Sequence, residues 1–420
     1  MNHSMILLSF VVSIAILFNS CNDPVSGVEP LPPPDTTSTI DEWDGPPILF
    51  KMRTKFEDYE PIERPVIIDN HIVQLLEDPS DKARMALVAT IDEPGDSVHF
   101  EVNSEMGYLY RSMRADQLGR CTFWERDRLV SIDPKTKSVQ EFIAPSEGNC
   151  YATETGSQFV TIEKTIGDEE GSVTLRKFNT STLSFDSLFQ LKVIKGPRQN
   201  MSFTYAQEVE VADANILTGV FTAYDPQTRT TPSYTFTYNL TADTLMWTKL
   251  FDMENDIANA AKNYATDSTI YAKSFGRIIA YDLRTGETKW QKDKPNADAE
   301  FWGTSPVMVG GGKVYAYADA NGLFGLDAET GEVVYYDETV TGTVVRAETY
   351  GDRFVVLSLD GGTINLFDPV SGEYDLQFKS PEHSGGNRTF FLDNFSVDRD
   401  RGWVAAQDFE YTYVFDISGY

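Results

Sequence analysis

The sequence feature that most constrains the fold is a short hairpin pattern that recurs along the chain. Within residues 276–290, a β-rich run ends at Asp282, a tight turn follows, and a second run closes on Trp290. An Asp that opens a turn accepts hydrogen bonds from backbone N–H groups two or three residues on. Gly286 suits the positive φ that such a turn requires. The pattern therefore predicts an antiparallel hairpin with its turn chemistry specified.

The same hairpin returns at a regular interval. The residues that open the turns, here called turn anchors, are Asp92, Asp133, Asn179, Asn239, Asp282, Asp327, Asp368 and Asp416. Successive anchors lie 41 to 48 residues apart, except for one step of 60. Periods of about 40–50 residues are typical of propeller blades. We interpret the long step, which contains residues 224–228, as an extended inner loop and not as an extra blade.

In the last four copies, a further short strand precedes the anchor by 11 to 13 residues, which indicates a repeated four-stranded unit. The repeat therefore predicts an all-β fold: a single eight-bladed β-propeller of four-stranded antiparallel blades over residues 45–420. Asp416 lies four residues from the C-terminus, so its hairpin lacks an outer strand. A circular array leaves few open edges only if its ends are joined. We expect residues 47–54 to pair beside the Asp416 strand and close the last blade.

The pattern G-x-[apolar]-x-A-x-D-x-x-T-G-E-x-x-W, best matched by residues 277–290 and 323–334, resembles the PQQ-like β-propeller repeat family. That family includes quinone-dependent dehydrogenases and non-enzymatic lipoproteins, among them an eight-bladed scaffold of the outer-membrane β-barrel assembly machinery. The resemblance also implies that Trp290 and Trp247 dock one blade on the next. The equivalent residues in other copies are Phe100, Phe142, Tyr335 and Tyr374.

The first 44 residues are typical of a targeting segment followed by a tether. An apolar run of about a dozen residues is too short for the ~20 of a membrane span and stops at Ser20-Cys21. This resembles the lipobox of bacterial lipoproteins, which implies cleavage after residue 20 and acylation of Cys21. The alternative is an ordinary secretory signal. Residues 21–44 are rich in Pro and Thr, which predicts an extended tether between a lipid anchor and the folded body.

The sequence offers no convincing catalytic or cofactor site. The quinone-dependent enzymes of the PQQ-like family carry two cysteines that are adjacent in sequence and lie over the cofactor. In this chain Cys21, Cys121 and Cys150 are far apart in sequence. The four histidines show no ligand spacing, so no metal site is predicted. With Cys21 used for lipid, Cys121 and Cys150 could form a disulfide between adjacent blades or remain two buried thiols. The sequence leaves both alternatives open. We predict no enzymatic activity, no cofactor and no metal.

The remaining expectation is partner binding. A net charge of −29 disfavours nucleic acid and anionic membrane surfaces, so membrane contact is expected only through the lipid anchor. When the residues common to all copies of a repeat serve the fold, binding and catalytic residues are expected in the irregular loops. The most irregular segments are residues 224–232, 252–263 and 291–302, with Tyr224, Phe301 and Trp302 as candidate anchors for an envelope protein. The alternatives are a glycan-binding or ligand-binding surface lipoprotein and, less favoured, a quinone-dependent dehydrogenase. The expected location is the bacterial cell envelope, at the outer membrane.

Overall fold

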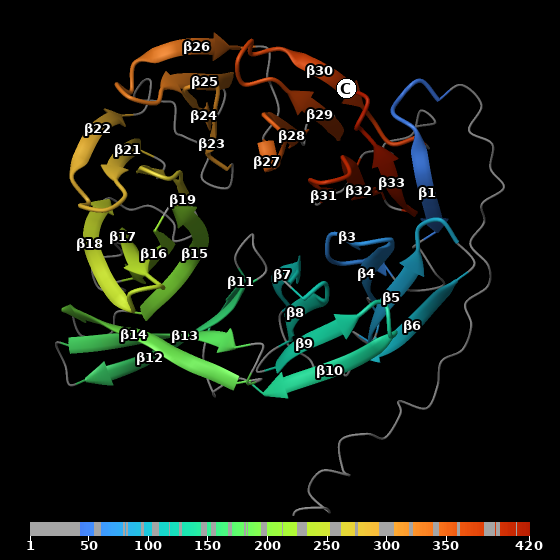
Figure 1. The fold of residues 1–420 in the computed structure, drawn as a ribbon, viewed down its shortest axis with the longest axis horizontal. Helices are drawn as coiled ribbons and strands as arrows, with labels where there is room; N and C mark the ends of the chain where they lie inside the picture. Colours follow the sequence, from blue (N-terminus) through green and yellow to red (C-terminus); the bar gives the residue numbers. More distant parts are fainter. Residues whose placement is uncertain are drawn as a thin grey trace, which may run out of the picture.

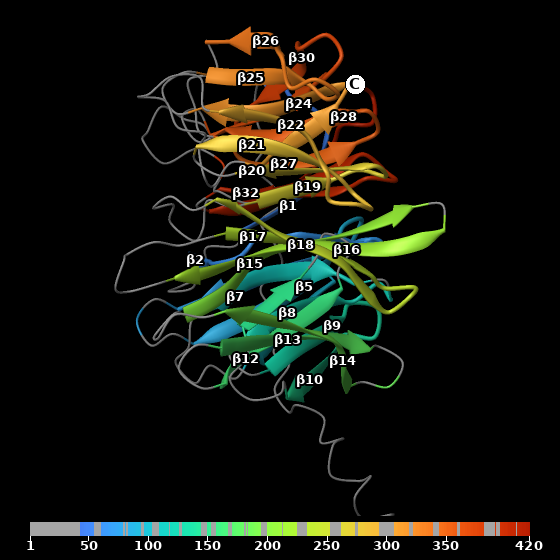
Figure 2. The ribbon, with the colours of Figure 1, turned by 90° about the vertical axis from the view of Figure 1, so that its left-hand side faces the viewer.

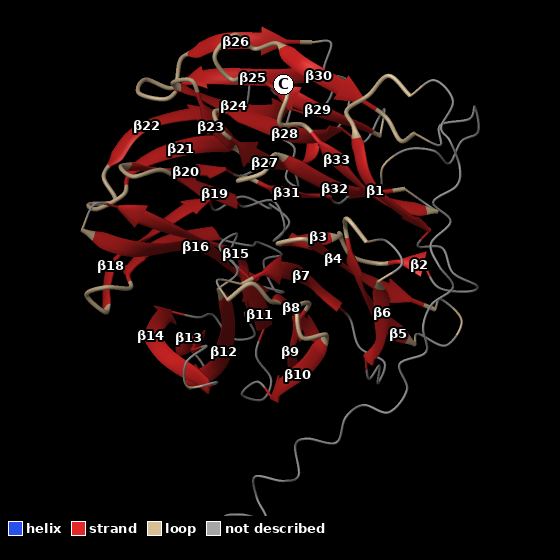
Figure 3. Cartoon of the chain, turned by 45° about the vertical axis from the view of Figure 1, so that its right-hand side comes forward, coloured by secondary structure: helices blue, strands red, loops and turns tan. Residues whose placement is uncertain are grey.

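The computed structural model describes the chain from residue 43 to its last residue, with internal gaps. The gaps are residues 54–59, 79, 81–82, 94–95, 103–108, 117, 126–127, 144–148, 153–156, 167–169, 180–181, 183, 195–199, 212, 225–232, 253–261, 274–275, 294–305, 319–321, 339–343, 359–361, 382–390, 392–394 and 409. The described residues form β-strands and turns and contain no helix (Figure 3). No helix that could span a membrane therefore occurs in that part of the chain.

The strands assemble into antiparallel sheets that follow one another around the middle of the molecule (Figure 1). Written from the middle outward, the first four sheets are β3 (Val66–Ile68), β4 (His71–Glu77), β5 (Arg84–Thr90) and β6 (Ser97–Val102); β7 (Leu109–Ala115), β8 (Cys121–Glu125), β9 (Arg128–Asp133) and β10 (Ser138–Ile143); β11 (Asn149–Ala152), β12 (Gln158–Ile166), β13 (Glu170–Asn179) and β14 (Ser184–Ile194); and β15 (Asn200–Val211), β16 (Ala214–Tyr224), β17 (Ser233–Asn239) and β18 (Thr244–Asp252).

The other four sheets follow the same order. They are β19 (Lys262–Ala265), β20 (Thr269–Lys273), β21 (Arg277–Asp282) and β22 (Thr288–Asp293); β23 (Met308–Gly310), β24 (Lys313–Ala318), β25 (Gly322–Asp327) and β26 (Val333–Asp337); β27 (Val344–Tyr350), β28 (Arg353–Ser358), β29 (Thr363–Phe367) and β30 (Tyr374–Phe378); and β31 (Phe395–Asp398), β32 (Trp403–Gln407), β33 (Tyr411–Asp416) and β1 (Ile48–Arg53). Figure 2, turned by 90°, shows that the strands run along the axis of this array.

The first sheet departs from the predicted four strands. The two-residue strand β2 (Glu60–Pro61) pairs with β4, as β3 also does, so this sheet has five strands. The 60-residue step between anchors forms no additional sheet among the described residues. Instead, β14, β15 and β16 run for 11, 12 and 11 residues, longer than the corresponding strands of every other sheet. The extra length therefore lies in long strands, and not only in the inner loop that the sequence predicted.

The N-terminal strand lies beside the C-terminal one. β1 pairs antiparallel with β33, with Ile48 opposite Phe415 and Met52 opposite Thr412. The backbone N–H of Asp416 extends the ladder by donating to the Pro47 carbonyl oxygen over 2.9 Å. Residues 47–54 were expected at this place because the last hairpin lacked an outer strand. β1, the first described strand, is thereby hydrogen-bonded to β33, the last described strand.

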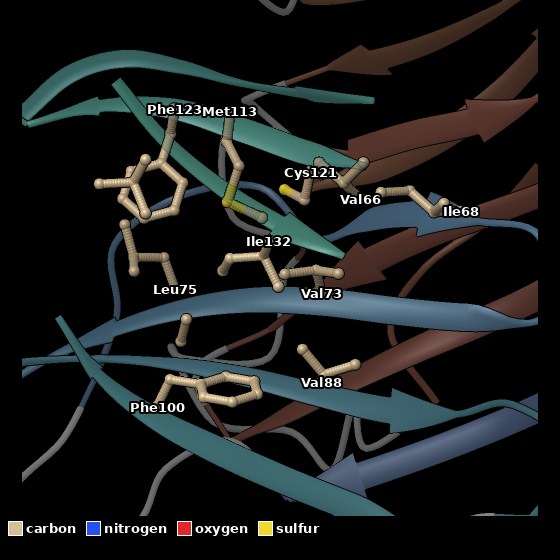
Figure 4. Close-up of a cluster of buried hydrophobic side chains, with 12 residues drawn as sticks. Val66, Ile68, Val73, Leu75, Val88, Phe100, Met113, Cys121, Phe123 and Ile132 are labelled. Carbon is tan, nitrogen blue, oxygen red and sulfur yellow. The ribbon is translucent and has the colours of Figure 1, made fainter. Parts of the chain in front are cut away.

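Neighbouring sheets meet through their innermost strands and through apolar side chains. The contacts between innermost strands join β3 to β7, β7 to β11, β11 to β15, β15 to β19, β27 to β31 and β31 to β3. In Figure 4, Val73 and Phe100 of the first sheet face Phe123 and Ile132 of the second. The cluster around Phe50 and Ile72 joins the last sheet to the first. The core is therefore divided among the interfaces between sheets, because each sheet buries its faces against its neighbours.

Candidate functional site

The turn anchors act as the sequence predicted at most positions. Oδ1 of Asp282 accepts from the N–H of Arg284 at 3.0 Å and of Thr285 at 2.8 Å, and the Gly286 N–H donates to the Asp282 carbonyl. The same pattern of acceptance from backbone N–H groups occurs at Asp133, Asn179, Asn239, Asp327, Asp368 and Asp416. The N–H and hydroxyl of Thr330 lower the pKa of Asp327. The anchor side chains therefore hydrogen-bond to the backbone of their own turns.

Asp92 makes a side-chain contact with a second turn of its sheet. Its carboxylate accepts from the side-chain amide of Asn70, which lies in the turn between β3 and β4. Residues 94–95 lie outside the described residues. A nearby turn is closed by the backbone, with the Asp96 N–H donating to the Glu93 carbonyl at 2.8 Å. Asp92 therefore links two turns of its sheet.

Aromatic side chains join each of three hairpin turns to the preceding sheet. The Trp290 indole N–H donates to the Ala328 carbonyl at 2.9 Å, and its ring lies where a Cβ on Gly331 would come within 2.6 Å. Trp247 makes the matching contacts with Leu283 and Gly286. The Tyr335 hydroxyl donates to the Gly372 carbonyl at 3.0 Å. The docking role implied for Trp247 and Trp290 is therefore present, and Tyr335 shares it.

The connections between strands divide the molecule into two faces. Along an antiparallel sheet, the second and fourth strands end on the face where the third strand and the next sheet begin. The strands that flank the four longest connections, residues 225–232, 253–261, 294–307 and 379–394, meet those connections at this face, and we call it the long-connection face. The opposite, tight-turn face carries the anchor turns, such as residues 283–287 between β21 and β22.

Of the predicted partner-binding residues, Tyr224 is described and ends a strand at the long-connection face. Tyr224 is the last residue of β16, and the β22–β23 connection contains Phe301 and Trp302, which lie outside the described residues. Part of the predicted irregular segments is regular: residues 291–293 belong to β22, and residues 262–263 belong to β19. Cys21 also lies outside the described residues. The binding role of the three aromatic residues stays a prediction.

The two remaining cysteines lie where the repeat placed them. Cys121 is on β8, second from the middle of the second sheet, and Cys150 is on β11, which opens the third. Cys121 is a fully buried free thiol among Val73, Met113 and Ile132. Burial raises the pKa of the Cys121 thiol well above its ordinary value. Because the thiolate is the reactive form, this thiol is chemically quiet in the folded protein.

A buried charged cluster on the innermost strands was not expected from the sequence. Arg64 donates to the Met113 carbonyl through Nε and Nη2, both at 2.9 Å, and its Nη1 lies 2.9 Å from Glu348 Oε1. Arg346 binds the same carboxylate oxygen, and its guanidinium lies 5.8 Å from the centre of the Phe395 ring. The cluster ties β7 and β27 to the segment before β3, across β31. Its partners are 284 residues apart, so no local pattern could reveal it.

A second buried polar group surrounds Asp408, on the long-connection face between β32 and β33. Its Oδ1 accepts from the N–H groups of Glu410 and Tyr411 at 2.8 and 2.7 Å. Its Oδ2 accepts from the hydroxyls of Ser380 at 2.5 Å and Tyr413 at 3.2 Å. Four hydrogen bonds satisfy a carboxylate that is 3% exposed. This arrangement shapes the turn and braces the residues after β30.

Comparison with known proteins agrees with this geometry. A family model described as "Outer membrane protein assembly factor BamB" matches residues 238–399, which confirms the resemblance to the PQQ-like repeat family. No curated protein sequence matches the chain significantly.

Solved propeller structures also match. BamB from Moraxella catarrhalis superposes with a TM-score of 0.54 at 13% identity, covering 89% of this chain and 100% of that one. Saccharomyces cerevisiae Sqt1 gives 0.54 at 10% identity, covering 89% and 99%. The Dos1 propeller gives 0.53 at 10% identity, covering 89% and 97%. At such identities the likeness establishes the propeller fold.

Proposed function

We propose that this chain is a lipid-anchored envelope protein whose propeller is a non-catalytic scaffold, which holds a protein partner on the long-connection face. The observation that carries the proposal is how the repeat uses its polar groups. The anchor carboxylates accept from their own turns, and the Trp247 and Trp290 indoles donate to neighbouring blades. The recurring residues are thus committed to structure, which leaves the connections to provide function.

The proposed architecture is one ring of eight blades over residues 45–420, closed by the N-terminal strand. The β1–β33 ladder and the contact of β31 with β3 support closure, because both join the end of the chain to its beginning. Full closure protects sheet edges that would otherwise pair with other chains. Within this proposal, residues 1–20 are a cleaved lipoprotein signal, Cys21 carries the lipid and residues 21–44 are the tether.

The finer proposal is a role in outer-membrane assembly. It rests on the family model, whose description names an assembly factor and which covers the blades with the most regular turns. A scaffold of that kind needs a rigid body and an irregular face, and both the aromatic docking of turns and the grouping of long connections fit this need. A glycan or another ligand held by loop aromatics, and a quinone-dependent oxidation, are the competing functions.

Co-purification from native envelopes tests the scaffold. We expect Tyr224→Ala, Phe301→Ala and Trp302→Ala, combined in one protein, to lose a partner that the unmodified protein retains. Leu118→Ala with Val370→Ala is the matched control, since both side chains are exposed, at 59% and 63%, on the tight-turn face. Retention of every partner by the triple variant, together with dye-linked oxidation or glycan binding by the pure protein, would contradict the proposal.

Lipid anchoring has a separate test. Cys21→Ser removes the thiol that the proposed lipid attachment uses, so the protein should move from the membrane fraction to the soluble envelope fraction. Cys121→Ser is the control, because that thiol is buried in the folded body. Unchanged membrane association of Cys21→Ser would remove lipid anchoring from the proposal and leave the scaffold intact.

A further inference from the structure

The outermost strand β26 presents apolar side chains along an open sheet edge. Val333, Val334 and Tyr336 are 45%, 52% and 49% exposed. β26 ends the order β23-β24-β25-β26, so within the described residues no strand pairs with its outer edge. Figure 1 shows β26 at the rim of the molecule, away from its middle. An apolar edge with free backbone groups is a template for another strand.

β26 differs from the other outermost strands in lacking a charged residue at an interior position. Its sequence, Val-Val-Tyr-Tyr-Asp, has a charged residue only at the last position. Each of the other seven outermost strands carries a charged residue at an interior position: Glu101 in β6, Glu141 in β10, Asp186 in β14, Lys249 in β18, Lys289 in β22, Asp375 in β30 and Lys51 in β1. Charges on edge strands oppose unwanted pairing. This protection is missing from β26.

The strand is also held firmly in place. Tyr335 faces the next blade, where its hydroxyl donates to the Gly372 carbonyl at 3.0 Å. Tyr336 packs against Phe324 of β25, with ring centres 4.7 Å apart. These two contacts, one from each face of the sheet, fix the strand on the blade. A fixed edge binds an added strand at a lower entropic cost than a flexible one.

The charged residues at the two ends of β26 indicate which kind of strand could pair with its outer edge. Exposed Glu332 precedes the strand and exposed Glu338 follows it, so both ends of the apolar stretch are acidic. An antiparallel pair of two β26 strands would bring Glu332 of one copy toward Glu338 of the other. Like charges at a strand pair destabilise it. Lysine or arginine at the ends of an added strand would instead complement both acidic ends.

We propose that the β26 edge receives an extended segment of a partner protein, with alternating apolar side chains and basic residues at its ends. The segment would add a fifth strand to the β23–β26 sheet through backbone hydrogen bonds, while Val334 and Tyr336 contact its apolar side chains. This inference goes beyond binding at the long-connection face, because the edge lies on the rim. Neither proposal requires the other.

A capped, dye-labelled peptide, Lys-Thr-Val-Thr-Val-Thr-Lys, tests the edge on the whole purified protein by fluorescence anisotropy. We expect saturable binding that V334K/Y336K weakens by about tenfold or more, since added charges restore the missing protection. I143K is the matched control, because Ile143 is 76% exposed on β10, an outermost strand that already carries Glu141. It should change binding by less than about twofold. Equal circular dichroism and thermal midpoints would show that both variants fold.

Two altered peptides identify the mode of binding. Methylation of alternate backbone nitrogens should abolish binding, because a strand cannot then donate to β26. Replacement of both lysines by glutamate should weaken it. The proposal fails if V334K/Y336K or the methylated peptide binds as well as the original.

It also fails, in favour of a second copy, if the free protein forms a dimer that V334K/Y336K dissolves. The Tyr224, Phe301 and Trp302 variant should keep peptide binding, which separates this test from that of the scaffold face.

Discussion

The turns on the tight-turn face are of two kinds that share one backbone path. Gly286, Gly331 and Gly372 have φ of 68°, 72° and 79° at the fourth residue after the anchor. Lys137 and Asp243 occupy the same position in their turns, with φ of 52° and 53°. The backbone conformation therefore does not depend on glycine. What distinguishes the glycine turns is the aromatic ring of the preceding blade that lies on them.

The comparison shows that the Gly-Glu pair that ends these turns, preceded by Thr or Ser, marks docking between blades more than it marks the hairpin itself. At Gly286, Gly331 and Gly372, a Cβ would come within 2.7, 2.6 and 2.3 Å of Trp247, Trp290 and Tyr335. At the other turns the contacts are polar: Lys137 pairs with Asp96 of the preceding sheet, and Asp243 accepts from the Tyr238 hydroxyl of its own hairpin. Docked turns pack against the preceding blade through an aromatic ring, whereas the turn at residues 133–137 meets the preceding sheet through the exposed ion pairs Lys135–Asp69 and Lys137–Asp96.

The largest effect should come from removing a docking ring. Trp290→Ala deletes a side chain that is 8% exposed and leaves a cavity over Gly331, so we expect the free energy of unfolding to fall by about 3–5 kcal/mol. Trp290→Phe keeps most of the ring but loses the hydrogen bond to Ala328, at a cost of about 1 kcal/mol. Denaturant titration measures both. Equal losses in the two variants would show that the hydrogen bond, and not packing, carries the docking.

The next effect should come from adding one methyl group beneath that ring. Gly331→Ala combines a left-handed backbone cost with a Cβ 2.6 Å from Trp290, so we expect a loss of about 2–4 kcal/mol. Gly312→Ala is the matched control: φ is 71° there, and no atom lies within 4 Å of the added Cβ. Its loss should be only about 1–2 kcal/mol. If the two variants unfold at the same denaturant concentration, the docking contact contributes nothing.

A smaller and opposite effect is expected at an undocked turn. Lys137→Gly removes the left-handed strain of a residue that has a Cβ, and gives up an exposed ion pair with Asp96. The two terms leave a gain of about 1 kcal/mol or less, because exposed pairs contribute little. Thermal denaturation compares it with the unmodified protein. A substantial loss would mean that Lys137 takes part in docking, against the division of the turns drawn above.

The smallest effect concerns pH. The Thr330 N–H lowers the pKa of Asp327, and the Val370 N–H lowers the pKa of Asp368. A carboxyl whose folded pKa lies below its unfolded value stabilises the protein above that unfolded value, about 4, and loses this effect as the pH falls through the folded pKa. Asp327→Asn with Asp368→Asn should therefore flatten the loss of stability below pH ~4. Parallel curves for variant and parent would contradict this.

Much of the fold was predictable because its determinants are local. An anchor such as Asp282 and its turn lie within five residues, and the interval between anchors reveals the repeat. The place of β1 was predictable because counting the strands of the repeat shows that the last sheet lacks its outermost strand. The length of β15 and β16 and the extra strand β2 could not be predicted, since the first depends on pairing between strands and the second spans only two residues.

The functional surfaces were less predictable. The Arg64–Glu348 contact joins segments 284 residues apart, and each residue alone looks like an ordinary surface charge. The apolar run of β26 is visible in the sequence, but its meaning depends on knowing that the strand is outermost and that the seven others carry charges. Tyr224, Phe301 and Trp302 are predicted because they lie in irregular segments of the repeat. Irregularity indicates which connections could bind a partner, but it does not identify individual contacts.

The pairing of β1 with β33 has a consequence for how the chain acquires its structure. Phe50 finds Val414 only after more than 350 intervening residues have been synthesised. Contacts between residues so distant in sequence slow folding, because the chain must lose the conformational entropy of closing a long loop before these contacts can form. During that interval β1 has no partner within its own sheet. A chaperone that shields β1 until β33 has been synthesised would therefore do more for the yield of native protein than one that acts on any internal hairpin.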